Sequence, residues 1–181
     1  MPRSRRQPRG TLFLIAGPSG AGKDTLIAEA RKRLSESYIF PRRVITRPTR
    51  SDAELHSFET EEWFHQARTE GRFALSWEAH GLLYGVPRTI DDDLKAGRHV
   101  VINVSREVVL TAREAYDPAR TILVTAPREI LERRLASRGR EPPGDIALRL
   151  ERQKDIPADA IILNDGNLGT ALDQFLTALT S

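Results

Sequence analysis

The chain has 181 residues, 39% of them hydrophobic and 29% charged, a composition typical of one soluble globular domain and unlike a disordered chain. It has no cysteine, which excludes disulfides, thiolate metal sites and cysteine nucleophiles. Its apolar runs are far shorter than the roughly 20 residues that span a bilayer, and no signal-peptide core follows the basic start. We therefore expect a cytoplasmic protein with no membrane contact.

The formal net charge of +3 arises at the beginning of the chain. Arg3, Arg5, Arg6 and Arg9 stand there without an acidic residue, and the rest of the chain is close to neutral. We expect residues 1–10 to form a disordered basic arm. A weak contact with a polyanion is the alternative, but the near-neutral charge of the remaining chain argues against nucleic acid as a partner.

Apolar strands and amphipathic helices alternate along the chain. In chain order we expect a strand at 10–17, a helix at 23–34, a strand at 42–46, a strand at 99–105, a helix at 106–116, a strand at 120–126, a helix at 127–139, a strand at 159–165 and a helix at 168–180. This alternation predicts an α/β domain over residues 11–181, with five parallel strands flanked by helices and ligands at the carboxyl ends of the strands.

Two stretches interrupt the alternation. Residues 47–97 contain a helical pattern at 60–71, short strands within 73–85 and a second helical pattern at 88–97. Residues 138–146, RGREPPGDI, are polar and rich in Arg, Pro and Gly. We expect the first stretch to be an acceptor-binding subdomain and the second to be a closing lid.

A glycine-rich loop follows the first strand. GPSGAGKD, residues 17–24, follows the phosphate-loop pattern G-x-x-x-x-G-K-[ST] up to its last position, where Asp replaces Ser or Thr. A strand before such a loop and a helix after it favour phosphate binding, because backbone N–H groups and the positive helix end face the ligand. We expect the following residues to bind a nucleoside triphosphate: Gly17, Pro18, Ser19, Gly20, Ala21, Gly22, Lys23, Asp24 and Thr25. A glycine-rich turn without a ligand is the alternative.

The chain resembles the guanylate kinase-like proteins. GPSGAGK, ITRPTR, LLYG, RLASRGR and LND occur in the order typical of that group, and the resemblance covers almost the whole chain from Thr11. GPSGAGKD, LSWEAHGLLYGV, NVSR and RLASRGRE resemble more closely one family of the group, the ribose 1,5-bisphosphate phosphokinases. The resemblance implies phosphoryl transfer from ATP, with Mg²⁺, to ribose 1,5-bisphosphate, giving 5-phosphoribosyl 1-diphosphate in phosphonate breakdown.

The resemblance also implies roles for single residues. The acceptor would be bound by Arg47, Arg50, Tyr84, Ser105 and Arg106; the catalytic residues would be Lys23, Arg134, Arg138 and Arg149; Arg138 and Asn164 would also contact ATP. For Asn164 a simple turn is the alternative, and for Arg42 and Arg43 the choice is between phosphate binding and a solvated loop. Trp63 and Trp77 are expected in the core.

The chain departs from guanylate kinases where those enzymes recognise guanine. Leu75 and Val86 fall at the positions of a carboxylate and a hydroxyl, and His56 falls at that of a tyrosine. Apolar side chains cannot hydrogen-bond a base edge, so these changes disfavour GMP as acceptor. A guanylate or other nucleoside monophosphate kinase and a non-catalytic interaction module are the alternatives, and the oligomeric state is open, a homodimer included.

Asp24 is the remaining departure in the phosphate loop. Phosphate-loop enzymes commonly place an aspartate at the end of the middle strand, where this chain has Asn103. Since Mg²⁺ prefers carboxylate oxygens, we expect Asp24 to be the metal residue, replacing the missing Ser or Thr and partly the missing strand carboxylate. A charge that only stabilises the start of the helix is the alternative.

Overall fold

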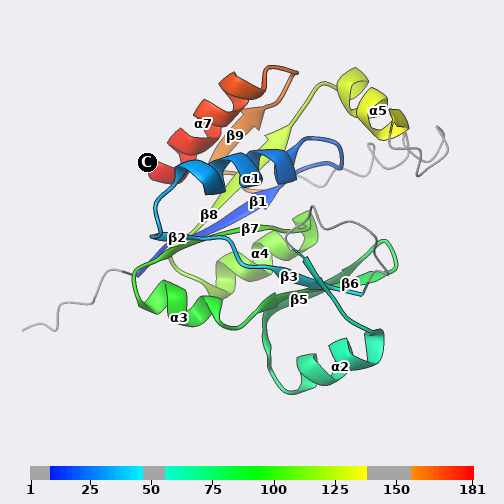
Figure 1. Cartoon of the computed structure of the whole chain (residues 1–181), viewed down its shortest axis with the longest axis vertical. Helices are drawn as coiled ribbons and strands as arrows, with labels where there is room; N and C mark the ends of the chain where they lie inside the picture. The colour runs from blue at the N-terminus through cyan, green and yellow to red at the C-terminus, as the bar shows by residue number, and fades with distance from the viewer. Residues whose placement is uncertain (1–8, 47–55, 138–155) are drawn as a thin grey trace, which may run out of the picture.

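The computed structural model describes residues 9–46, 56–137 and 156–181. Figure 1 shows helices on both faces of a central sheet and a second, smaller sheet to one side. The central sheet has five parallel strands in the order β2–β7–β1–β8–β9. Their bounds are β1 Leu12–Ala16, β2 Tyr38–Ile39, β7 His99–Asn103, β8 Ala119–Thr125 and β9 Ala160–Leu163. The predicted fold class is confirmed.

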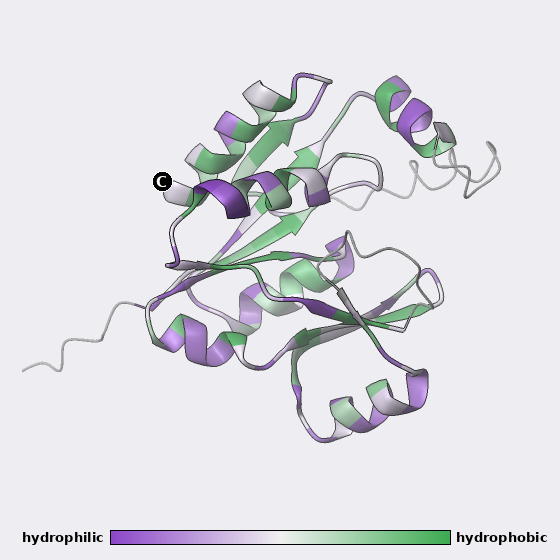
Figure 2. Cartoon of the chain, in the orientation of Figure 1, coloured by the Kyte–Doolittle hydropathy of each residue, from purple (hydrophilic) through white to green (hydrophobic). Residues whose placement is uncertain are grey.

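Strand β1 is the centre of the core, since each of its five residues is at most 2% exposed. Side chains of a strand alternate between the two faces of its sheet. Phe13 and Ile15 pack against α1 (Lys23–Arg33) and α7 (Leu168–Thr180), whereas Leu12 and Leu14 pack toward α3 (Ile90–Lys95) and α4 (Arg106–Ala115). Figure 2 accordingly shows the inner strands as hydrophobic and the outer helix surfaces as hydrophilic. Helices therefore cover both faces of the central sheet, and the loops that follow the carboxyl ends of its strands lie at one open edge.

The second sheet has the strand order β4–β3–β6–β5. Its strands are β3 Arg43–Ile45, β4 His56–Phe58, β5 Phe73–Ala79 and β6 Leu82–Pro87, and α2 spans Glu61–Thr69. One face packs on α2 through Phe73 and Leu83, while Leu75 and Val86 on the other face join the core beneath the central sheet. We call these four strands the acceptor sheet, after the acceptor-binding role that the sequence predicts for residues 47–97. The sheet packs on the central sheet through a common core.

The structure corrects one predicted strand. Residues 42–46 were expected in the parallel sheet, but β3 pairs antiparallel with β6 and so belongs to the acceptor sheet. The two-residue strand β2, which pairs with β7, takes its place at the edge of the central sheet. Helix α5 (Arg128–Ser137) follows β8 as predicted. Within the described ranges, no helix combines the length and the apolar character needed to cross a membrane.

Candidate active site

The glycine-rich loop joins β1 to α1 at the carboxyl edge of the central sheet. Gly17 and Gly22 have φ angles of 145° and 88°, in the region that favours glycine. A Cβ at Gly17 would overlap the carbonyl oxygen of Val124, and a Cβ at Gly22 would overlap the side-chain nitrogen of Asn164. Both positions therefore need glycine for two reasons, the backbone conformation and the space.

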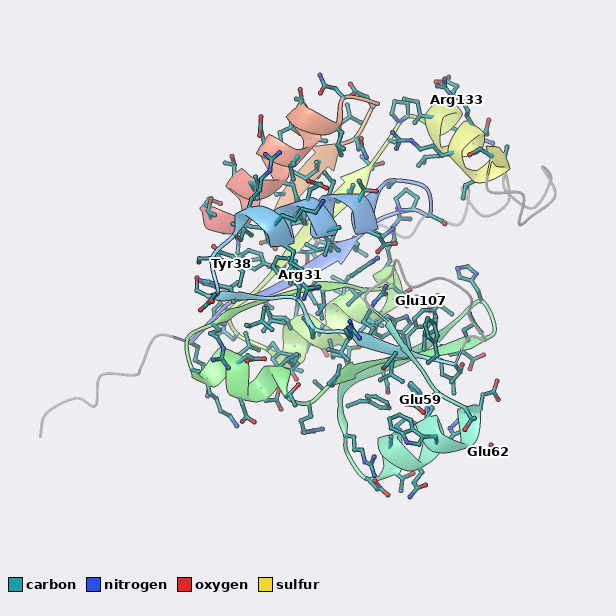
Figure 3. The ribbon with its side chains drawn as sticks, viewed as in Figure 1. Arg31, Tyr38, Glu59, Glu62, Glu107 and Arg133 are labelled. Carbon is teal, nitrogen blue, oxygen red and sulfur yellow. The ribbon has the colours of Figure 1, made fainter. Side chains whose placement is uncertain are left out.

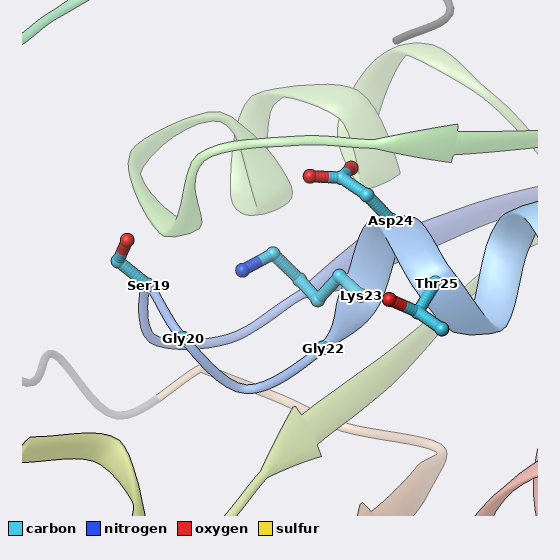
Figure 4. Close-up of a pocket in the computed structure, with 6 residues that line it drawn as sticks. All are labelled: Ser19, Gly20, Gly22, Lys23, Asp24 and Thr25. Carbon is cyan, nitrogen blue, oxygen red and sulfur yellow. The ribbon is translucent and has the colours of Figure 1, made fainter. Parts of the chain in front are cut away.

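Lys23 closes the loop from inside. Its Nζ donates hydrogen bonds to the carbonyl oxygens of Gly17 and Pro18, both at 2.9 Å. Figure 4 shows the hollow beside this lysine, which is lined by Ser19, Gly20, Gly22, Lys23, Asp24 and Thr25. The ammonium group of Lys23 therefore lies beside this hollow, and the backbone of the loop and of the first turn of α1 lines it. Backbone N–H groups at a helix start, together with a lysine, are an arrangement that binds phosphate.

Two side chains hold the loop from outside. Asn164, which is 5% exposed, donates from Nδ2 to the carbonyl oxygen of Ala21 at 2.8 Å. Arg134 on α5 donates from Nη1 to the carbonyl oxygen of Gly20 at 3.2 Å. Arg133 is exposed and lies on the outer side of α5 (Figure 3). The structure therefore brings Arg134 and Asn164 to the loop. The catalytic role predicted for Arg134 and the ATP contact predicted for Asn164 stay predictions.

Asp24 turns toward β7 rather than along its own helix. Its Oδ1 accepts a hydrogen bond of 2.7 Å from Nδ2 of Asn103, the last residue of β7. In Figure 4 the carboxylate points toward the green segment that contains β7 and α4. The residue that replaces the usual Ser or Thr thus contacts the residue that replaces the usual strand aspartate.

An aromatic pair marks the face of the acceptor sheet that carries Leu75 and Val86. Trp77 and Tyr84 are directly paired across β5 and β6, and their rings stack with 5.4 Å between centroids and 5° between planes. The guanidinium carbon of Arg43 lies 6.0 Å from the centroid of the Tyr84 ring. Nη1 of Arg43 also donates to the carbonyl oxygen of Asn103 at 2.9 Å. Because Arg43 contacts both the Tyr84 ring and the last residue of β7, Tyr84 lies near the end of that strand.

The two positions at which the resemblance places guanine recognition in guanylate kinases, Leu75 and Val86, are buried. Leu75 is 7% exposed and Val86 fully buried, and both pack in the core with Ile90 and Val108. Ser105 and Arg106 begin helix α4 directly after β7, on the same side of the central sheet as this core. The acceptor sheet thus presents Arg43 and the stacked rings of Trp77 and Tyr84 near the end of β7, while Leu75 and Val86 are buried in the core.

The contacts of two residues could not be expected from the sequence pattern alone: Asn103 binds Asp24, and Arg43 binds the end of β7. Trp63 and Trp77 pack against the core as predicted, and Trp77 also stacks on Tyr84. The position of Asn103 at the end of a parallel strand was a usable signal, because ligands bind at that edge. Four predicted site residues lie outside the described residues: Arg47, Arg50, Arg138 and Arg149. The basic arm up to residue 8 and the lid at 138–146 lie outside them as well.

A phosphate loop between a parallel strand and a helix, with an acceptor sheet beside the same edge, defines a P-loop kinase of the guanylate kinase type. A crystal structure of guanylate kinase from Anaplasma phagocytophilum has this fold, with a TM-score of 0.73 and 19% identity over 96% of this chain and 86% of that one. No family model matches the chain.

Curated relatives identify the family more narrowly than the fold does. Ribose 1,5-bisphosphate phosphokinase PhnN of Methylobacterium radiotolerans is 47% identical over 159 residues, 87% of this chain and 90% of the relative. The protein of the same name from Acidiphilium cryptum is 47% identical over 182 aligned positions, 99% of this chain and 94% of the relative. The chain belongs to the ribose 1,5-bisphosphate phosphokinase family.

Proposed function

We propose that the chain transfers the γ-phosphoryl group of ATP to ribose 1,5-bisphosphate, forming 5-phosphoribosyl 1-diphosphate and ADP. The observation that carries this proposal is the pairing of a phosphate loop with an acceptor surface that lacks a place for a base. Lys23 and the loop face the donor side, whereas Arg43 and Tyr84 face the acceptor side. We further propose that the reaction belongs to phosphonate breakdown, as the family resemblance implies, and that it takes place in the cytoplasm.

The acceptor side suits a sugar phosphate better than a nucleotide. Leu75 and Val86 are closed into the core and offer no hydrogen-bonding group to a guanine edge. Arg43 supplies a guanidinium group beside the Tyr84 ring, and guanidinium groups bind phosphate oxygens through paired hydrogen bonds. Arg47 and Arg50 are proposed as the further phosphate-binding arginines, by the resemblance of ITRPTR to the family.

The proposed chemistry needs no general base. The 1-phosphate of the acceptor is largely ionised near neutral pH, since the second pKa of a phosphate monoester is about 6. One of its oxygens forms the new bond to the γ-phosphorus, the bond from that phosphorus to the β-phosphate oxygen breaks, and ADP leaves with the electron pair. The protein contributes position and positive charge, which we assign to Lys23, Arg134, Arg138 and Arg149.

A divalent metal accompanies ATP in kinases generally, and we propose Mg²⁺ for this chain, held by Asp24. Within residues 9–46, 56–137 and 156–181 no three His, Cys, Asp or Glu side chains cluster into a ready metal site. The proposed role does not need such a cluster, because Mg²⁺ is usually bound by one or two carboxylates together with phosphate oxygens and water. The bound ion would neutralise charge on the transferring phosphate. Asp24 lines the loop hollow, so its carboxylate, phosphate oxygens and water would together supply the oxygen ligands that Mg²⁺ prefers.

The experiment is a phosphoryl transfer assay with two acceptors. Purified protein with MgATP should convert ribose 1,5-bisphosphate to 5-phosphoribosyl 1-diphosphate and leave GMP unchanged, as followed by ion-exchange chromatography of both products. Conversion of GMP alone would overturn the proposal in favour of a nucleoside monophosphate kinase. An absence of turnover, together with an absence of thermal stabilisation by ATP, would favour an interaction module, because only a bound ligand raises the apparent stability.

A further inference from the structure

Asn103 occupies a fixed position between the donor and acceptor sides. It is the last residue of β7, the strand that lies between β1 and β2, and it is in register with Ile15 on β1. The next residue, Val104, donates from its backbone to the carbonyl oxygen of Ile15 at 2.9 Å. Because the buried centre of the sheet sets the course of the backbone here, Asn103 is a rigid point from which other groups can be oriented.

The side chain of Asn103 acts toward the phosphate loop. An ionised carboxylate can only accept hydrogen bonds, so the 2.7 Å contact with Asp24 places the NH₂ end of the amide against Oδ1. The two residues are 79 positions apart in the chain. The bond therefore joins α1 to β7 and selects one direction for a carboxylate that is otherwise exposed at the start of its helix.

Helix α1 does not need this bond for its attachment. Leu26, Ile27 and Ala30 bury one face of the helix in the core, and Asp24 is already favoured by its place in the first turn. The amide of Asn103 instead fixes the orientation of the Asp24 carboxylate. Its hydrogen bond holds Oδ1, and this also fixes the direction in which Oδ2 points.

The main chain of Asn103 acts toward the acceptor side. Its carbonyl oxygen accepts the 2.9 Å hydrogen bond from Arg43, the arginine beside the Tyr84 ring. One residue thus contacts a carboxylate of the donor side through its side chain and a guanidinium group of the acceptor side through its backbone.

We propose that Asn103 is a positioning residue of the reaction: its amide orients the Asp24 carboxylate toward the donor metal, and its carbonyl orients Arg43 toward the acceptor. The inference rests on the proposed function, because it assumes that Asp24 holds the metal that accompanies ATP. Hydrogen bonds to a metal-binding carboxylate fix its orientation, and their removal typically lowers metal affinity or activity by about 10- to 100-fold.

The test measures metal-dependent nucleotide binding without turnover. The melting temperature of the protein is recorded with saturating ADP over a range of Mg²⁺ concentrations. Asn103→Leu keeps the approximate size of the side chain and removes the donor. We expect it to raise the Mg²⁺ concentration at half-maximal stabilisation by about tenfold. The shift caused by ADP without metal should stay as in the unchanged protein.

A double-mutant cycle identifies the route of the effect. Asp24→Asn should itself raise the half-maximal Mg²⁺ concentration, and Asn103→Leu should add little in that background, since the amide acts through the carboxylate. Asn167→Leu is the matched control. Asn167 accepts from the backbone of Thr170 at the start of α7, so its loss should lower the melting temperature while leaving the half-maximal Mg²⁺ concentration unchanged.

An unchanged Mg²⁺ dependence in Asn103→Leu would overturn the inference, as would full additivity with Asp24→Asn. If leucine prevents folding, Asn103→Ala removes the same donor without adding an apolar group and is measured in the same way. If the unchanged protein shows no Mg²⁺-dependent stabilisation by ADP, the proposed donor site itself is wrong, which is a distinct result from a variant that behaves like the parent.

Discussion

At the scale of single residues, Gly22 has no room for a side chain unless Asn164 moves. It has a φ angle of 88°, and a Cβ there would overlap the Asn164 nitrogen that holds the Ala21 carbonyl. A left-handed conformation alone costs a non-glycine residue about 1–2 kcal/mol. We expect Gly22→Ala to lower the free energy of unfolding by more than this, because the added Cβ also overlaps Asn164. It should also abolish the thermal stabilisation by ADP, because Asn164 must move away from the loop.

The effect of space can be separated from that of conformation at Gly71. Its φ angle is 70°, but an added Cβ would meet no atom within 4 Å. Gly71→Ala should therefore lower stability through conformation alone and retain ADP binding. Equal loss of ADP binding in both variants, measured by thermal shift, would contradict the role given to the contact between Gly22 and Asn164.

Arg43 carries a second prediction at this scale. A lysine cannot keep both the hydrogen bond to the Asn103 carbonyl and the planar contact with the Tyr84 ring. We expect Arg43→Lys to lower kcat/KM for ribose 1,5-bisphosphate by about tenfold, corresponding to about 1.4 kcal/mol, with the KM for ATP nearly unchanged. Arg42→Lys, at the neighbouring exposed arginine, is the matched control in the same steady-state assay. An equal loss in both variants would contradict a specific role for the contacts of Arg43 with Asn103 and Tyr84.

At the scale of elements, a polar network ties α4 and β8 to the beginning of β9. Asp159 Oδ2 accepts from the backbone N–H of Thr121 at 2.6 Å and pairs with Arg113, which also donates to the Thr121 hydroxyl at 3.1 Å. Partial burial of Asp159 by itself raises the pKa of its carboxyl. The hydrogen bonds from Arg113 and from the backbone of Thr121, together with the positive charge of Arg113, outweigh this effect, so the pKa is below its ordinary value.

This lowered pKa fixes the sign of a pH effect. The carboxyl of Asp159 binds a proton less readily in the folded state than in the unfolded chain, where the pKa of an aspartate is about 3.9. The network therefore contributes its full stability above that pH and loses it as the pH falls through the folded pKa. Asp159→Asn should lower the unfolding free energy at pH 7 by about 1–2 kcal/mol, and the difference from the parent should shrink on acidification toward about pH 3.

Urea unfolding at several pH values measures this difference. Asp173→Asn, on the exposed surface of α7, is the control and should match the parent at every pH. A difference for Asp159→Asn that stays constant down to about pH 3 would contradict the assignment, because it would mean that the charge of the carboxylate is not responsible.

At the scale of the whole molecule, local sequence patterns predicted the central sheet but not every strand in it. The apolar runs of β1, β7, β8 and β9 were recognisable because strands buried on both faces are nearly continuous in hydrophobicity. Strand β2 has only two residues, too few for a pattern, and β3 looked like a buried strand although its partner, β6, lies far along the chain.

The candidate site, like the central sheet, could be predicted from the sequence only in part. The loop follows from a continuous motif, whereas the pairing of Asp24 with Asn103 and that of Arg43 with Asn103 join residues 79 and 60 positions apart. Such contacts depend on which strands become neighbours. One sequence carries no direct signal of that choice beyond the general rule that strand ends meet at one edge.

The common core predicts that the two sheets unfold together. Leu75 and Val86 of the acceptor sheet pack in the same cluster as Leu12 and Leu14 of the central sheet, so neither sheet can expose its side of this core alone. Both tryptophans, Trp63 and Trp77, belong to the acceptor region, whereas far-ultraviolet circular dichroism reports on all elements. Tryptophan fluorescence and circular dichroism should therefore give coincident urea transitions, as a two-state domain requires.

Val86→Ala tests that coupling from the acceptor side. Val86 is fully buried, and loss of its two methyl groups should cost about 2 kcal/mol. Both transitions should move to lower urea by the same amount. Leu110→Ala, at a residue of α4 that is 58% exposed, should move neither by more than about 0.5 kcal/mol. If the fluorescence transition moved while the circular dichroism transition stayed in place, the acceptor sheet would be an independent folding unit, and the contact of Asn103 with Arg43 would join two separately stable parts.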